Sequence, residues 1–148
     1  MPIRPARAIL IGYLIAFPIS LLLGFIATTL LPEAQPPQFD VEGPAAIVAL
    51  VLFAPIAETL IMGAALLFLL LFLPPTAAII VSAVGWGIAH SMLAPMWGLI
   101  IWWPFLIFST LFVAWRVRSL ALAFAIPMCV HALQNLLPAL LIARGMTG

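Results

Sequence analysis

One glutamate, two histidines and an asparagine stand inside long apolar runs of the chain. Glu58 lies in "FAPIAETLIMGA", His90 ends "WGIAH", and His131 and Asn135 lie in "HALQN". A carboxylate beside an imidazole can take a proton from water, and imidazole and amide N–H groups can stabilise an oxyanion. Ionisable side chains inside a membrane cost free energy unless they face a polar interior, and by default they indicate a functional site. These four residues are therefore the candidate site.

The chain as a whole is too apolar for a water-soluble domain. Of its 148 residues, 67% are hydrophobic and 6% are charged, whereas a soluble domain carries roughly a quarter charged residues. The formal charge of +1 and the lack of a basic run exclude an evident nucleic-acid partner. The composition predicts an all-α, polytopic bundle of transmembrane helices that forms a single membrane domain, with the lipid bilayer as its main partner.

Five segments reach or approach the ~20 apolar residues that a spanning helix needs. They are residues 8–31, 45–73, 77–93, 96–115 and 120–143. A polar loop at 32–44 separates the first span from the core region, 45–143, which carries the candidate site. The second segment is longer than the hydrocarbon core is thick, so it must tilt or break, and Pro55 is the natural place for a break.

Three of these segments, 45–73, 77–93 and 120–143, are expected to bring the candidate residues to one level. At about 1.5 Å per residue, Glu58 and His90 each lie about 22 Å from the inner ends of their helices. His131 and Asn135 lie about 18 and 24 Å from theirs. The four side chains are therefore predicted to form one site, toward the outer half of a ~30 Å hydrocarbon core.

The arginines predict the orientation of the chain. With the N-terminus inside, only Arg144 falls on the outer side, and four arginines fall on the inner side: Arg4, Arg7, Arg116 and Arg118. The positive-inside rule favours this topology.

The same motifs carry a resemblance to a known family. "APIAETLIMGA", "WGIAH" and "HALQN" resemble the three motifs of the CAAX-protease and bacteriocin-processing (CPBP, Abi) family of glutamate-type intramembrane proteases. The pattern of that family reads E-E-x-x-x-R, F-x-x-x-H and H-x-x-x-N, and Trp86 stands here in place of the phenylalanine. The resemblance covers about residues 45 to 142.

The resemblance implies a hydrolase, an intramembrane peptidase without a cofactor. Glu58 and His90 would hold and deprotonate a water, and His131 and Asn135 would donate to the oxyanion. The substrate would be a membrane-associated protein or peptide, such as an exported or C-terminally anchored protein, cut near the membrane surface. The expected location is a prokaryotic cytoplasmic membrane, with the N-terminus inside.

Two positions depart from the family pattern. Thr59 replaces the second glutamate and Gly63 replaces the arginine, two positions that lie i and i+4 on one helix and could pair. Their joint change is interpreted as the removal of an auxiliary pair, because losing one partner alone would strand a buried charge. An alternative register, with Ala57 and Glu58 at the two glutamate positions, implies an inactive enzyme. Pro55, three residues before Glu58, favours the first register.

Three other types of protease are disfavoured, and two alternatives remain. No aspartate lies in a span and neither H-E-x-x-H nor G-x-S-x-G occurs, which argues against aspartyl, common zinc and serine proteases. A zinc site made of Glu58, His90 and His131 is possible, because two histidines and a carboxylate form a known ligand set. The alternative from another class is a non-catalytic membrane protein of the same fold, a small transporter or a scaffold.

Overall fold

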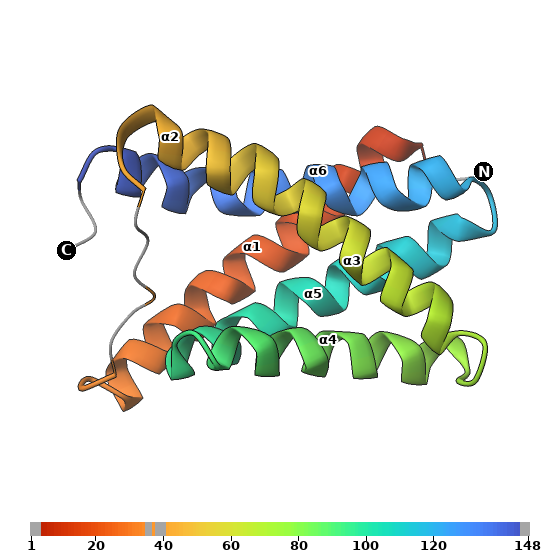
Figure 1. Cartoon of the computed structure of the whole chain (residues 1–148), viewed down its shortest axis with the longest axis horizontal. Helices are drawn as coiled ribbons and strands as arrows, with labels where there is room; N and C mark the ends of the chain where they lie inside the picture. The colour runs from red at the N-terminus through yellow and green to blue at the C-terminus, as the bar shows by residue number, and fades with distance from the viewer. Residues whose placement is uncertain (1–3, 35–36, 38–40, 146–148) are drawn as a thin grey trace.

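The protein is a bundle of helices, and no strand occurs in the residues that the computed structural model describes, 4–34, 37 and 41–145. The elements are α1 (Pro5–Leu30), α2 (Gly43–Ile47), a π-helical stretch η1 (Val48–Phe53), α3 (Ala54–Leu69), α4 (Pro75–Ser91), α5 (Pro95–Arg116) and α6 (Leu120–Ala143) (Figure 1). The predicted all-α class is confirmed.

Within the described part of the chain, four helical units are long and apolar enough to cross a membrane. They are Pro5–Leu30, Gly43–Leu69, Pro95–Arg116 and Leu120–Ala143. The remaining predicted span, 77–93, corresponds to α4, which has 17 residues and is at the short end of the range that spans a bilayer. Many large apolar side chains lie on the outside of the bundle, as expected where lipid is the solvent. This is the architecture of an integral membrane protein.

The second predicted span differs from its expected form. The helix is not broken at Pro55; it runs from Gly43 to Leu69 and is wound as a π-helix over Val48–Phe53, just before the proline. It also ends four residues earlier than hydropathy suggested: residues 70–73 form the turn that leads to Pro74, and a proline disfavours helical geometry at the residue before it.

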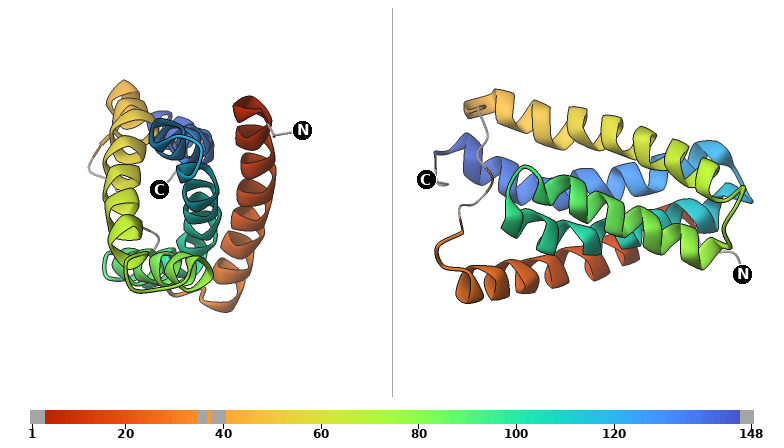
Figure 2. Two further views of the ribbon diagram at one scale, coloured as in Figure 1. Left: turned by 90° about the vertical axis from the view of Figure 1, so that its right-hand side faces the viewer. Right: turned by 60° about the horizontal axis from the view of Figure 1, so that its bottom comes forward.

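Short turns make the last helices antiparallel neighbours. Pro75 and Pro95 each stand in the first turn of a helix, where a missing N–H costs nothing. The side chain of Ser119 caps α6 by accepting a hydrogen bond from the N–H of Leu122 at 3.3 Å. Viewed along the bundle, α5 and α6 lie between α1 on one side and the α2–α3 unit on the other (Figure 2).

The core of the bundle is aromatic and centred on α5. Phe105, Phe108 and Phe112 are at most 1% exposed and pack against Met62 and Leu66 of α3. This wall of rings faces the helices that carry the candidate site.

Small residues bring α4 very close to α5. A Cβ added at Gly98 would overlap the carbonyl oxygen of Gly87 and the Oγ of Ser91. The Oγ atoms of Ser82 and Ser109 lie 3.0 Å apart in the same interface and form a buried hydrogen bond. Close backbone contact and polar pairs of this kind hold helices together in lipid.

Candidate functional site

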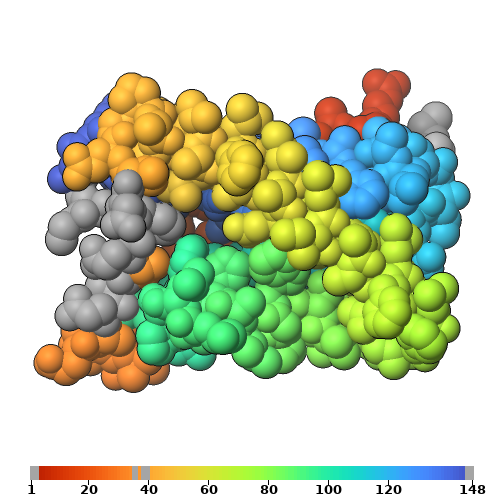
Figure 3. Space-filling view, viewed as in Figure 1, coloured from red at the N-terminus to blue at the C-terminus, as the bar shows by residue number. Residues whose placement is uncertain are grey.

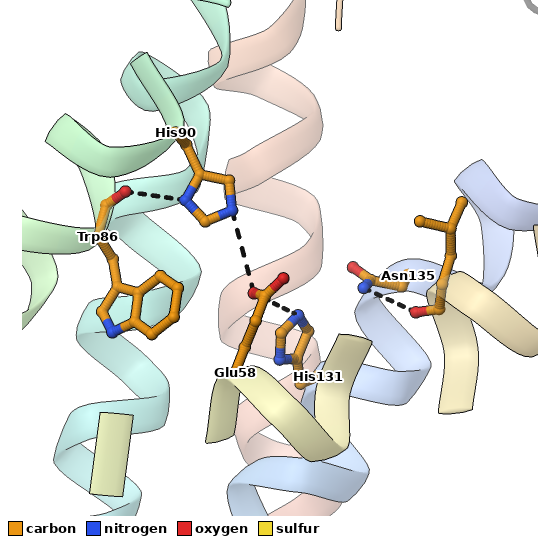
Figure 4. Close-up of polar contacts among 6 residues, drawn as sticks. Glu58, Trp86, His90, His131 and Asn135 are labelled. Atoms are coloured by element: carbon orange, nitrogen blue, oxygen red, sulfur yellow. Dashed lines mark hydrogen bonds and ion pairs between the residues drawn. The ribbon is translucent and has the colours of Figure 1, made fainter. Parts of the chain in front are cut away.

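The Glu58 carboxylate lies between the two histidine rings. Its Oε2 is 3.9 Å from Nε2 of His90 and 3.8 Å from Nε2 of His131 (Figure 4). The histidine side chains are 8% and 5% exposed, whereas Glu58 is 26% exposed. Residues from α3, α4 and α6 thus meet at one point, so the structure brings together three of the four predicted side chains.

The His90 ring is fixed from both sides. Its Nδ1 donates a hydrogen bond to the Trp86 carbonyl one turn earlier, at 2.8 Å. Because a carbonyl oxygen can only accept, the hydrogen lies on Nδ1 and Nε2 is turned to Glu58. The ring also packs edge-to-face on Trp97, with centroids 4.6 Å apart.

The His131 ring is held by aromatic packing. It stacks on Phe108 with centroids 4.8 Å apart and meets Phe105 edge-to-face, with centroids 5.5 Å apart. Its Nδ1 is buried and has no hydrogen-bond partner within the described part of the chain. The ring is therefore positioned by shape, with Nε2 toward Glu58.

Sequence reasoning missed this aromatic wall of Trp97, Phe105 and Phe108. Trp86 belongs to it as well, because it stacks on Phe105 with a centroid distance of 4.3 Å. Phenylalanines in an apolar helix occur in any hydrophobic core, so their positions in the sequence do not show that these rings line a site.

Asn135 does not join the other three side chains directly. Its Nδ2 donates to the carbonyl oxygen of Leu50 in η1, at 2.9 Å (Figure 4). In an α-helix that carbonyl would accept from Ala54, but the N–H of Ala54 bonds to the Ala49 carbonyl instead. The π-helical partner would be residue 55, a proline without an N–H. Asn135 therefore supplies the donor that Pro55 lacks.

The two departures from the family pattern both lie in the packed interior. Thr59 is 1% exposed, and its Oγ1 has no hydrogen-bond partner within the described residues. At Gly63 an added Cβ would overlap the ring of Phe124 and lie 2.8 Å from Cε2 of Phe112. The space that a larger side chain would need at position 63 is filled by phenylalanine rings.

A metal site is not evident in the geometry. Within the residues that the structure describes, no three or more His, Cys, Asp or Glu side chains are grouped so as to hold a metal ion. The alternative zinc ligands, Glu58, His90 and His131, form a carboxylate–imidazole cluster with separations of 3.8 and 3.9 Å.

The surface is hollowed near this part of the bundle. In the space-filling view, a depression separates the α2–η1 segment, in orange and yellow, from the green end of α4 (Figure 3). The blue surface of α6 is visible at its bottom. The partial exposure of Glu58 makes its carboxylate the member of the cluster that is most open to the surroundings.

Comparison with known proteins returned no match, whether to family models, curated sequences or solved structures.

Proposed function

We propose that the protein is a glutamate-type intramembrane endopeptidase that cleaves a membrane-associated polypeptide with a water activated by Glu58. One observation carries the proposal: the single acid found inside an apolar span meets both histidines of the chain. The resemblance of the three motifs supports the same activity.

The separations suit a water between the side chains. Distances of 3.8 and 3.9 Å are too long for a direct hydrogen bond, and a water at about 2.8 Å from two such atoms can bridge them. Glu58 takes a proton from this water while Nε2 of His90 accepts its other hydrogen. The water oxygen then attacks the scissile carbonyl carbon.

The remaining steps use His131 and the same carboxyl group. In the tautomer with its hydrogen on Nε2, His131 donates to the oxyanion that forms on the carbonyl oxygen. The intermediate collapses as the carbon–nitrogen bond breaks. Glu58 returns its proton to the leaving amine, which restores the carboxylate.

Asn135 is assigned a positioning role in this proposal. Its amide holds the Leu50 carbonyl, which fixes η1 against α6 just ahead of the turn that bears Glu58. Donation to the oxyanion, as the family resemblance implies, would have to come from the second N–H of the same amide.

The packing of α3 supports the register in which Glu58 is the active acid. Glu58 contacts both histidines, whereas its neighbour Thr59 is buried in the interior. A second glutamate at position 59 would lack a partner, because Gly63 leaves no arginine to pair with it.

The apolar exterior favours a substrate that shares the membrane. The leucine, isoleucine and phenylalanine side chains exposed along the helices suit contact with lipid, so a polypeptide anchored in the bilayer would reach the site most readily. An exported or C-terminally anchored protein in a prokaryotic cytoplasmic membrane fits this description.

The test is hydrolysis by the reconstituted protein. The full chain is placed in liposomes with a panel of single-span peptides in H₂¹⁸O, and the products are analysed by mass spectrometry. We expect a product pair in which the new carboxylate carries one ¹⁸O. Glu58-dependent proton flux without any cleavage would contradict the proposal and indicate transport. Cleavage that a chelator abolishes and zinc restores would indicate a metal mechanism.

A further inference from the structure

The N-terminus and the α5–α6 turn lie at the same end of the bundle (Figure 1), and a recess lies at this end. It opens between α1 and α5 and has a volume of about 230 Å³. This α1–α5 recess is lined by Ala8, Ile11, Leu111, Ala114, Trp115 and Arg118.

Small side chains create the recess. One turn deeper in α1, a Cβ added at Gly12 would lie 2.9 Å from Cδ1 of Leu111 and 3.2 Å from Cγ2 of Val130, so the helices close tightly there. Toward the end of the bundle, alanines at positions 8 and 114 leave space between the same helices. The result is an apolar slot with a closed inner end.

A cation and an indole ring stand at its open end. The guanidinium carbon of Arg118 lies 4.9 Å from the centroid of the Trp115 ring. A guanidinium has five N–H donors in a fork that matches phosphate oxygens, so it can serve an anion in addition to stacking on a ring. Tryptophan is enriched at the headgroup level of a membrane, and arginine side chains near helix ends extend to that level.

The whole end of the bundle is cationic. Arg4 and Arg7 on the N-terminal side and Arg116 and Arg118 at the α5–α6 turn gather there. Glu33 and Glu42 lie at the opposite end, where α1 ends and α2 begins.

We propose that the α1–α5 recess binds one anionic phospholipid, with its phosphate at Arg118 and one acyl chain along the apolar slot. Because one water occupies about 30 Å³ in the liquid, a recess of this volume has room for part of one acyl chain. The apolar walls distinguish a lipid from free phosphate, which would gain nothing from Ile11 and Leu111. Basic pockets between transmembrane helices are typical sites for anionic lipid headgroups. The inference does not depend on the chemistry at Glu58.

The test counts lipids bound to the purified full chain. Native mass spectrometry in detergent compares added phosphatidylglycerol, phosphatidylcholine and inorganic phosphate. We expect one phosphatidylglycerol per chain, bound in preference to phosphatidylcholine. Arg118→Gln should weaken its binding about five-fold, the equivalent of one arginine at a membrane surface. Ala114→Phe should reduce it as well, because the ring fills the slot without changing the charge.

Two control variants separate a defined site from general attraction. Arg4→Gln removes a charge from the same end without touching the recess, and Arg144→Gln removes one from the opposite end; both should keep the wild-type affinity. Equal binding of both lipids, equal losses in Arg4→Gln and Arg118→Gln, or equal binding of phosphate alone would overturn the proposal. The charge variant and the filling variant act by separate means, so a folding defect in one leaves the other decisive.

Discussion

Each histidine at the Glu58 carboxylate is held by groups other than the carboxylate. His90 is tied to the Trp86 carbonyl and packed on Trp97, and His131 is stacked on Phe108. Side chains whose orientation is locked in advance need no rearrangement when charge develops in a reaction. Glu58 is the least enclosed of the three, as expected for the group that must exchange protons with water.

Loss of either imidazole tests this arrangement at the scale of one residue. His90→Ala and His131→Ala should each lower kcat by about 10²- to 10³-fold, because one loses a partner of the water and the other a donor to the oxyanion. The measurement is the steady-state cleavage rate in liposomes, with circular dichroism to verify the fold. Thr110→Ala, an exposed change on α5, serves as the control and should retain full rate. Full activity of both histidine variants would exclude these roles.

At the scale of an element, the long helix of Gly43–Leu69 owes its shape to a proline and an asparagine. Pro55 has no N–H to donate to the carbonyl of Leu50, and the π-helical stretch η1 forms just before this proline. The side chain of Asn135 in α6 donates a hydrogen bond to that carbonyl instead. The π-helical stretch is therefore coupled to α6 through one hydrogen bond.

A double-mutant cycle tests that coupling. Asn135→Ala should destabilise the protein by about 1 kcal/mol, typical of an interhelical hydrogen bond in a membrane. In a Pro55→Ala background the new backbone N–H can serve Leu50, so the same substitution should cost less than half as much. Thermal unfolding in detergent measures all four variants. Strictly additive effects would show that Pro55 and Asn135 act independently.

Gly63 is predicted to tolerate no side chain. Gly63→Ala places a Cβ against the rings of Phe124 and Phe112, and overpacking of this kind costs about 1–3 kcal/mol. Phe124→Leu should recover much of the loss by clearing the space. Gly85→Ala, where an added Cβ has no neighbour within 4 Å, is the matched control on a lipid-facing helix surface. An unfolding temperature that is equally affected at both glycines would contradict the packing argument.

The elements show what hydropathy can and cannot predict. Residues 120–143 match α6, because a long apolar run with a serine cap specifies a helix locally. The π-helical winding and the Asn135–Leu50 bond depend on which helix packs beside η1, which no local pattern records. The match of Phe124 to Gly63 is equally a property of two helices. For the site, spacing placed Glu58 and both histidines together but gave no sign of the rings around them.

At the scale of the molecule, charge is divided between the two ends of the bundle. Four of the five arginines gather at the end with the N-terminus and the α5–α6 turn, whereas Glu33, Glu42 and Arg144 lie at the other end. Between them the surface is apolar. The positive-inside rule then predicts that the arginine end faces the cytoplasm.

Cysteine labelling tests this orientation. In a Cys129→Ala background, Met92→Cys places a thiol in the α4–α5 turn and Val117→Cys places one in the α5–α6 turn; these positions are 83% and 78% exposed. A membrane-impermeant maleimide added to intact cells should label position 92 and should reach position 117 only after permeabilisation. Labelling in the reverse order would invert the topology.

The central claim is tested most directly by replacing Glu58 with glutamine and measuring cleavage of a membrane-anchored peptide in liposomes. The glutamine keeps the shape of the side chain but cannot accept the proton of the water, so the account predicts a loss of at least about 10³-fold in kcat. Glu42→Gln, an exposed acid outside the site, is predicted to cleave at the wild-type rate. Cleavage by the Glu58→Gln protein at the wild-type rate would contradict the account.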